Sequence, residues 1–136
     1  MKTVITDYIP QRPPMVMVDE LIRCDHERAV SSLQIRAENI FVENKKFTEA
    51  GLIENMAQTA AAMVGYDCAS RNVPVPVGFI AAVKNLAIES MPDVASTIQT
   101  SVIVTNQVMN VTIIEGRVEQ MGKSLCTCEM KILIQK

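Results

Sequence analysis

One stretch, residues 47–71, constrains the fold more than any other part of the sequence. Apolar residues recur there at three- and four-residue spacing for more than three turns, which predicts a long α-helix beginning near Thr48. The opposite face is also apolar, with Leu52, Ala62 and Met63. We therefore expect a helix enclosed by other structure. The first apolar face comprises Ile53, Met56, Ala57, Ala60, Ala61 and Val64.

Two polar residues interrupt this apolar helix, Glu54 and Gln58. They are four residues apart, so they project from the same side of consecutive turns. A carboxylate among apolar side chains is either poorly placed for stability or used in function. On the residues alone, a structural role and a functional role are equally open.

The length of 136 residues predicts a single domain, residues 1–136. Nine methionines and no tryptophan indicate a core filled partly with flexible side chains, which would also suit a long apolar ligand; simple gap filling is the plainer interpretation. The formal charge of −2 gives no basic field, so we expect neither nucleic acid nor an anionic membrane as a partner.

The N-terminal residues contain polar side chains and three prolines before any apolar stretch of signal-peptide length, and the longest apolar run ends at Lys84. We therefore expect a cytoplasmic protein without a membrane span. The four cysteines lack metal-site spacing, and His26 is the sole histidine. Reduced thiols, no metal and no cofactor are the resulting expectations.

The rest of the sequence predicts strands. Residues 15–22 and 29–36 form an expected hairpin around a polar turn, and residues 37–46 form a polar connection to the helix. Four strands follow, at 77–88, 96–105, 108–119 and 125–135, with turns at 106–107 and 120–123. This order predicts an α+β fold in which a long antiparallel sheet curls around one helix.

Two motifs carry a resemblance to a known family. Residues 9–19, IPQRPPMVMVD, resemble the LPHRxPMLLVD opening of FabZ-type 3-hydroxyacyl-acyl-carrier-protein dehydratases, and residues 53–58, IENMAQ, resemble their EAMAQ helix. Gly78-Phe79-Ile80 and Lys84 fit the strand after that helix. The resemblance implies the hotdog fold, a dimer, and acyl-chain tunnels at the dimer interface bordered by Asn55, Gly78 and Phe79.

The sequence departs from that family at its histidines. The catalytic histidine belongs to a GHFP segment before the helix, and residues 43–48, ENKKFT, are a shorter segment without it. Gln11 replaces the histidine of the opening motif. The shortened segment and IENMAQT, residues 53–59, are similar to the divergent ApeP-like subgroup of aryl-polyene clusters. This implies a dehydratase-like protein that acts on or binds acyl thioesters in fatty-acid or polyene synthesis.

Dehydration needs proton removal beside a carbonyl, polarisation of that carbonyl, and protonation of the departing hydroxyl. Glu54 is the predicted general acid or base, and Gln58 would hold its carboxylate or an ordered water. Backbone N–H groups near Gly51 would polarise the carbonyl, since the helix start is the positive end of the dipole. Gly51 has no side chain, so a thioester oxygen could approach it closely. His26 lies in an expected exposed turn, and Tyr66, Asp67 and Cys68 are about three turns from Glu54.

Three hypotheses follow. The first is a 3-hydroxyacyl-carrier-protein dehydratase based on Glu54, completed by a second subunit or a different hotdog partner. The second is a hotdog thioesterase, which needs no histidine. The third is a non-catalytic subunit that binds an acyl thioester or pairs with an active hotdog enzyme. The expected partners are an acyl thioester on acyl carrier protein or coenzyme A, and a second hotdog chain in a homodimer or hetero-oligomer.

Overall fold

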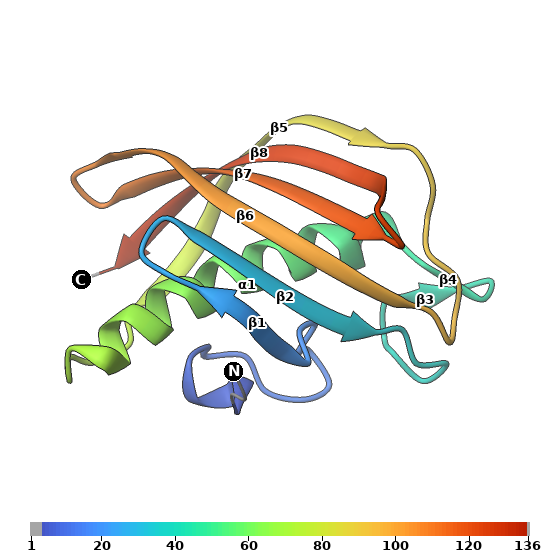
Figure 1. The fold of residues 1–136 in the computed structure, drawn as a ribbon, viewed down its shortest axis with the longest axis horizontal. Coiled ribbons are helices and arrows are strands. Elements are labelled where there is room, and N and C mark those ends of the chain that lie inside the picture. Colours follow the sequence, from blue (N-terminus) through green and yellow to red (C-terminus); the bar gives the residue numbers. More distant parts are fainter. Residues whose placement is uncertain (1–3, 136) are drawn as a thin grey trace.

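A curved antiparallel sheet closes around one long helix in the computed structural model, which describes residues 4–135 (Figure 1). Residues 1–3 and 136 of the predicted domain lie outside that range. The helix is α1, Glu49–Ser70, and matches the predicted helix closely. The strands of the sheet are β1 (Glu20–Cys24), β2 (Arg28–Gln34), β5 (Val77–Ile88), β6 (Thr97–Val108), β7 (Val111–Gln120) and β8 (Lys123–Gln135).

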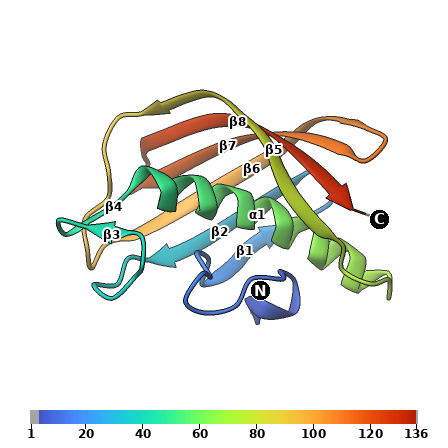
Figure 2. The same ribbon diagram turned by 180° about the vertical axis from the view of Figure 1, so that it is seen from behind.

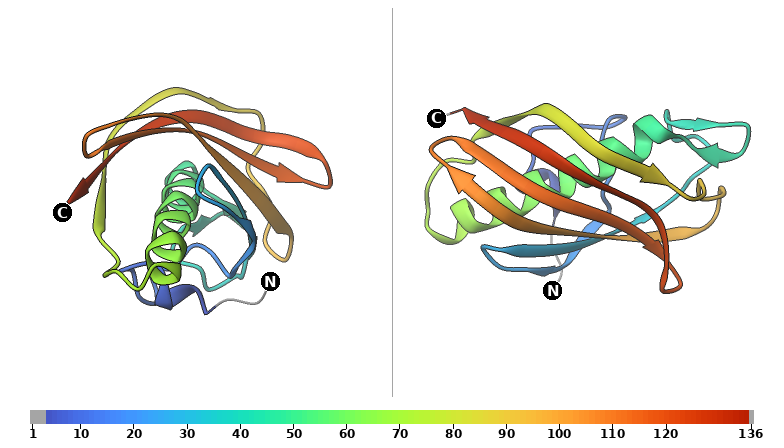
Figure 3. Two further views of the ribbon diagram at one scale, coloured as in Figure 1. Left: turned by 60° about the vertical axis from the view of Figure 1, so that its left-hand side comes forward. Right: turned by 90° about the horizontal axis from the view of Figure 1, so that it is seen from above.

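The strand order is β1-β2-β6-β7-β8-β5, and every neighbouring pair is antiparallel. The sheet bends because extra residues interrupt its ladders, including two irregularities where β5 pairs with β8 and one where β6 pairs with β7. Seen along the helix, the sheet arches over α1 with β5 and β1 on opposite sides (Figure 3). The α+β layout expected from the sequence is confirmed.

The helix is enclosed on nearly every side. Each residue of α1 from Gly51 to Cys68 is buried or half-buried, as the apolar opposite face predicted. The sheet covers one side, and the N-terminal segment with a short 3-10 helix, Ile5–Asp7, crosses the other (Figure 2). No helix among residues 4–135 is long and apolar enough to cross a membrane.

The two helix faces differ in a way that periodicity alone did not predict. Ile53, Ala57, Ala61 and Val64, placed on the main apolar face, are only half-buried. Several neighbours are fully enclosed instead: Leu52, Asn55, Met56, Gln58, Thr59, Ala62 and Met63. The deepest contact with the sheet therefore includes polar residues, while a stripe of small side chains faces less crowded space.

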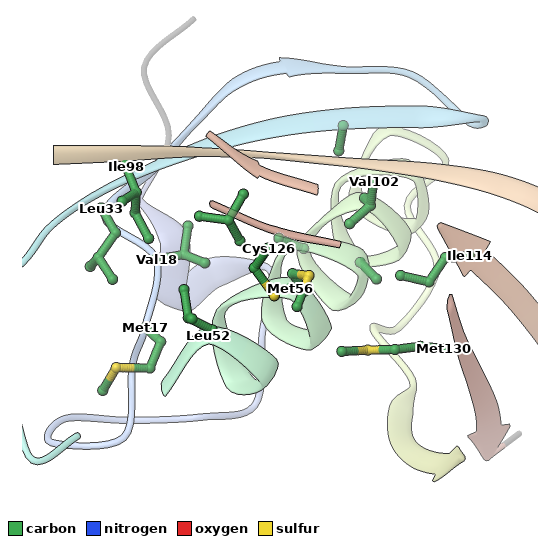
Figure 4. Packing of buried hydrophobic residues seen from close by; sticks show 14 of the residues in the cluster. Met17, Val18, Leu33, Leu52, Met56, Ile98, Val102, Ile114, Cys126 and Met130 are labelled. Atoms are coloured by element: carbon green, nitrogen blue, oxygen red, sulfur yellow. The ribbon is translucent and has the colours of Figure 1, made fainter. Parts of the chain in front are cut away.

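Met56 lies in the core, close to Cys126 (Figure 4). Its sulfur accepts a hydrogen bond from the Cys128 thiol, with the two sulfurs 3.7 Å apart. A side chain on Gly116 would place Cβ 2.8 Å from the Met56 sulfur, so β7 needs glycine there for the helix to pack closely. Cys126 and Cys128 of β8 are both buried.

The meander is confirmed, but one of its turns was misplaced. Met121 and Gly122 join β7 to β8 with positive φ angles of 52° and 78°, within the predicted turn at 120–123. The turn expected at 106–107 is wrong, because β6 continues to Val108 and the chain reverses at 109–110. Val108 and Met109 are apolar but exposed, 59% and 89% accessible, and their apolar character made them look like the start of the next strand.

The first predicted strand is also partly wrong. Residues 15–18 are not in the sheet, and β1 begins at Glu20. Their backbone groups bond to helix side chains, since Gln58 binds the Met15 carbonyl and the Met17 amide, and Asn55 binds the Met17 carbonyl. The predicted polar connection, residues 37–46, contains an unpredicted hairpin formed by β3 (Val42–Glu43) and β4 (Lys46–Phe47).

Candidate functional site

A cavity of about 240 Å³ lies between α1 and the β5, β7 and β8 side of the sheet. Small helix residues make room for it, since Ala57, Ala60 and Ala61 present only methyl groups to the space. Its walls are mostly apolar. The lining residues are Gln11, Glu54, Ala57, Ala60, Ala61, Met63, Val64, Pro76, Gly78, Phe79, Ile80, Thr112, Ile114, Ile132 and Ile134.

A second, more open hollow adjoins this cavity towards the C-terminal end of the helix. The two share part of their walls, formed by Met63, Val64, Pro76, Thr112 and Ile134. From Glu54 to Val64 the helix rises by about 15 Å. The combined space is therefore elongated along α1, with an ionisable group near one end.

Glu54, the predicted general acid or base, is half-buried and lines the cavity. It is the one ionisable side chain in the wall formed by the described residues. Gln58 donates a hydrogen bond from Nε2 to Glu54 Oε2 over 2.9 Å. The predicted contact between these two residues is present, and it fixes the orientation of the carboxylate.

Gln58 is itself held at every polar atom. Its Oε1 accepts a hydrogen bond from the Met17 amide at 2.6 Å, and its Nε2 also donates to the Met15 carbonyl at 2.8 Å. Its side chain is fully buried. A buried amide with all its bonds made has little freedom to rotate, so Glu54 is hydrogen-bonded to a rigid donor.

Asn55 lies apart from this cavity. The family resemblance implied a tunnel residue, but the Asn55 side chain is fully buried and does not line the cavity. Its Nδ2 donates to the Met17 carbonyl at 2.8 Å, and its Oδ1 accepts a hydrogen bond from the Thr100 hydroxyl. Asn55 therefore links the helix to the N-terminal segment and to β6. It does not face the cavity as its neighbour Glu54 does, because successive residues of a helix point in different directions.

Gly51 also lies elsewhere than expected. It does not border the cavity, and a Cβ there would approach the Phe47 ring to 2.5 Å and Phe41 Cβ to 2.8 Å. The missing side chain is thus required by aromatic packing at the helix start. Gly78 and Phe79 do line the cavity, and Phe79 is 52% exposed.

Gln11 is a lining residue that sequence reasoning noted only as a lost histidine. Its Oε1 is buried and has no hydrogen-bond partner within residues 4–135. The position of Gln11 in the opening motif, four residues before the segment bound by Gln58, was a signal that could have placed it beside the helix. Gln11 and Glu54 are the main polar groups of the cavity, together with the Thr112 side chain.

The other candidate groups lie away from this arrangement. The His26 side chain is 77% exposed beside Glu27, as expected for a turn residue. Asp67 forms an ion pair with Arg71 at 3.0 Å near the helix end. Burial raises the pKa of the Cys24 thiol to about 11, with Asp25 and Asp67 adding to the effect. Burial also raises the pKa of Cys126 to about 11 and that of Cys128 to about 12.

Over residues 4–135 the structure contains no cluster of three or more histidine, cysteine, aspartate or glutamate side chains suited to a metal ion.

The fold is shared with many solved structures. A chain of the dehydratase heterocomplex ApeI:P from Xenorhabdus doucetiae aligns with 100% of this chain and 93% of its own length, with a TM-score of 0.93 at 15% identity. A hypothetical thioesterase from Streptococcus pneumoniae TIGR4, solved with coenzyme A, aligns over 85% and 84%, with a TM-score of 0.68 at 8% identity. The PaaI protein from the E. coli phenylacetic acid degradation operon aligns over 83% and 80%, with 0.65 at 13%. These likenesses establish the hotdog fold.

Sequence comparison identifies the family. No protein with a curated description matches significantly. The ApeP-like family, described as ApeP dehydratase, matches residues 3–135. Because this match spans nearly the whole chain and agrees with the shortened segment before the helix, the protein belongs to the ApeP-like dehydratase family.

Proposed function

We propose that the protein binds acyl thioesters in this cavity and dehydrates 3-hydroxyacyl groups, with Glu54 exchanging the proton. The observation that carries the proposal is the position of Glu54, the one ionisable side chain in a largely apolar wall of described residues. Membership of the ApeP-like family supports the same reaction class.

The shape and lining of the cavity favour an extended apolar ligand. Isoleucines of β7 and β8 face the small side chains of Ala57 and Ala61, so an acyl chain between them would exchange water for apolar contacts. The adjoining hollow gives a longer chain space to continue along α1. The reacting end of the chain would then lie near Glu54.

In the proposed reaction, the Glu54 carboxylate removes a proton from carbon 2 of the acyl chain. The electron pair forms the double bond between carbons 2 and 3 while the bond from carbon 3 to the hydroxyl oxygen breaks. The leaving hydroxide takes the same proton back from Glu54, so the products are water and the 2-enoyl thioester. One carboxyl group suffices for both transfers, because the proton it removes is the proton that the leaving group requires.

A second hotdog chain, identical or different, is part of the proposal. Strand β5 is an edge of the sheet, and its apolar residues Val77, Phe79 and Ile80 are exposed by 41%, 52% and 38%. An exposed apolar edge favours pairing with another strand. The fold is shared with a protein described as a dehydratase heterocomplex, which supports assembly of this kind. A partner at β5 would lie beside the cavity and could supply the donor that polarises the thioester carbonyl.

One assay separates the candidate functions. The purified protein is incubated with 3-hydroxyacyl thioesters of several chain lengths, each on acyl carrier protein and on coenzyme A, and the acyl mass is followed. Loss of one water supports the dehydratase. Release of the free acid identifies a thioesterase. A thioester that is bound but unchanged supports a non-catalytic acyl-binding subunit, which the absence of histidine from the described cavity wall would explain.

A further inference from the structure

The unpaired amide oxygen of Gln11 sets this residue apart. Among residues 4–135, Gln11 Oε1 is the one buried side-chain oxygen or nitrogen without a hydrogen-bond partner. Buried polar atoms in proteins nearly always have a hydrogen-bond partner, because an unpaired one loses its bonds to water without replacement. Gln11 therefore carries a stability cost at a position where an apolar residue would carry none.

The backbone around Gln11 is firmly placed. On its N-terminal side, the Tyr8 ring packs edge-on against Tyr66 of α1, with ring centroids 5.5 Å apart. The Tyr8 carbonyl lies so close to Gly65 that a Cβ there would come within 2.0 Å of the oxygen. On its C-terminal side, Gln58 holds the Met15 carbonyl. Gln11 thus belongs to the cavity wall on a segment that is anchored at both ends.

The local turn adds to this anchoring. Arg12 Nη1 donates hydrogen bonds to the backbone carbonyls of Ile9 and Gln11, both at 2.8 Å, and the Met15 amide donates to the Arg12 carbonyl at 2.9 Å. Ile9 is 3% exposed and packs in the core. These contacts hold the backbone of Gln11 without using its side-chain amide, and its Oε1 is left without a partner.

The chemistry of an amide facing an apolar cavity selects a particular ligand group. A hydroxyl both donates and accepts hydrogen bonds, so it pairs with either end of an amide, whereas a methylene pairs with neither. In the ligand class proposed above, the 3-hydroxyl distinguishes the acyl chain that can lose water from the saturated chain that cannot. Resting on that proposed function, we propose that the Gln11 side chain recognises the 3-hydroxyl and sets the preference for 3-hydroxyacyl over unsubstituted acyl thioesters.

Binding measurements test this assignment in a Glu54→Gln background, which keeps the thioester intact. The probes are 3-hydroxyoctanoyl and octanoyl groups, each on coenzyme A and on acyl carrier protein. With Gln11 present, the hydroxylated ligand should bind about tenfold more tightly than the unsubstituted one. Gln11→Met, similar in length and flexibility, should remove this preference and leave the affinity for the octanoyl ligand unchanged.

A second measurement on Gln11→Met and one further variant keep the outcome decisive. Gln11→Met replaces an unpaired polar group by an apolar one, so its melting temperature should equal or exceed that of the parent. Gln11→Glu retains an acceptor for the ligand hydroxyl and should keep part of the preference. An unchanged preference in Gln11→Met, or an equal loss of affinity for both ligands, would overturn the assignment of Gln11 alone. Failure of both ligands to bind the parent protein would overturn the proposed function and this inference with it.

Discussion

Gln58 Nε2 donates to Glu54 Oε2 over 2.9 Å while the same nitrogen donates to the Met15 carbonyl over 2.8 Å. The residue that orients the cavity carboxylate therefore also fastens the N-terminal segment to the helix. The sequence left structural and functional roles open for this pair; these hydrogen bonds give Gln58 a structural role, and its contact with Glu54 is the one that the proposed function uses. The orientation of Glu54 depends on residues 15–17, far from it in the sequence.

Replacing Glu54 with glutamine should separate chemistry from stability. The substituted side chain keeps an oxygen that accepts the Gln58 hydrogen bond, so the melting temperature should change little. Turnover of a 3-hydroxyacyl thioester, measured by mass spectrometry, should fall by about 10²–10⁴-fold, the range typical of a lost general acid or base. Glu49→Gln, in the exposed first turn of the same helix, is the matched control. Normal turnover in Glu54→Gln would remove the carboxylate from the mechanism.

Replacing Gln58 with leucine should destabilise the fold. The substitution leaves the Met17 amide and the Met15 carbonyl without their partner, and two such losses together cost about 2–4 kcal/mol. Urea denaturation measures the change in the free energy of unfolding. Gln99→Leu, on an exposed position of β6, makes the same chemical change and should stay within about 0.5 kcal/mol of the parent protein. Equal effects of the two substitutions would contradict the anchoring role of Gln58.

Leucine substitutions at two adjacent alanines should affect different properties, ligand binding at Ala61 and stability at Ala62. Ala61 lines the cavity, so Ala61→Leu should fold normally and weaken binding of long acyl thioesters by more than about tenfold by filling their space. Ala62 is fully buried, so Ala62→Leu should cost about 1–3 kcal/mol of stability through overpacking. Calorimetric titration and thermal unfolding measure the two effects. Unimpaired binding of long chains to Ala61→Leu would place the acyl group elsewhere.

A lysine on the sheet edge should prevent association. If β5 pairs with a second copy, sedimentation of the parent protein should give roughly 30 kDa, twice the chain mass of 15.0 kDa. Val77→Lys should give a monomer, because a charged side chain on an exposed edge strand opposes pairing. Val77 does not line the cavity, so the substitution leaves the cavity wall intact. Met121→Lys, in the distant exposed turn between β7 and β8, should not. A monomeric parent protein would exclude self-pairing and leave a different hotdog chain as the partner to seek.

The buried thiols predict a loss of stability at alkaline pH. The pKa values of Cys126 and Cys128, about 11 and 12 in the folded protein, exceed the ordinary value of 9.0. Below pH 9 both states keep the thiols protonated, so these groups add no pH dependence. Above pH 9 the unfolded chain releases protons that the folded chain retains, so unfolding becomes easier. Urea denaturation at pH 8 and pH 10 should show this decrease.

A cysteine variant controls for other titrating groups. Cys126→Ala combined with Cys128→Ala should be less stable at pH 8, since it removes buried sulfurs from the core. It should nevertheless lose less stability than the parent between pH 8 and pH 10. An identical loss in both proteins would assign the pH dependence to other residues.

The sequence predicted the fold well because its strongest signals concern local periodicity. The long helix repeats its apolar pattern for several turns, and the meander alternates over long strands. Residues 15–18 were assigned to a strand because apolar residues with high β-propensity look the same in a sheet and beside a helix. Their hydrogen bonds go to Asn55 and Gln58, partners 38 to 43 residues away that no local pattern reveals.

The candidate site was predictable only in part. Glu54 and Gln58 stood out because polar residues inside an apolar helix are unusual. Asn55 belongs to the same motif, yet its side chain points into the core. Neighbouring residues of a helix point in different directions, so adjacent positions of one motif can face different surroundings. Gly51 suggested a close approach, and its packing partner is the Phe47 ring. Which neighbour fills the space beside a glycine depends on tertiary packing.

The overlap between the cavity wall and the sheet edge couples two equilibria. Phe79 and Ile80 line the cavity and are also exposed on β5, where a second chain would pair. A chain that covers this edge therefore alters the surroundings of any ligand inside, and the ligand alters the surface offered to the chain. By thermodynamic reciprocity, each event changes the free energy of the other by the same amount. If the second chain is another copy of this protein, apparent ligand affinity should accordingly vary with protein concentration.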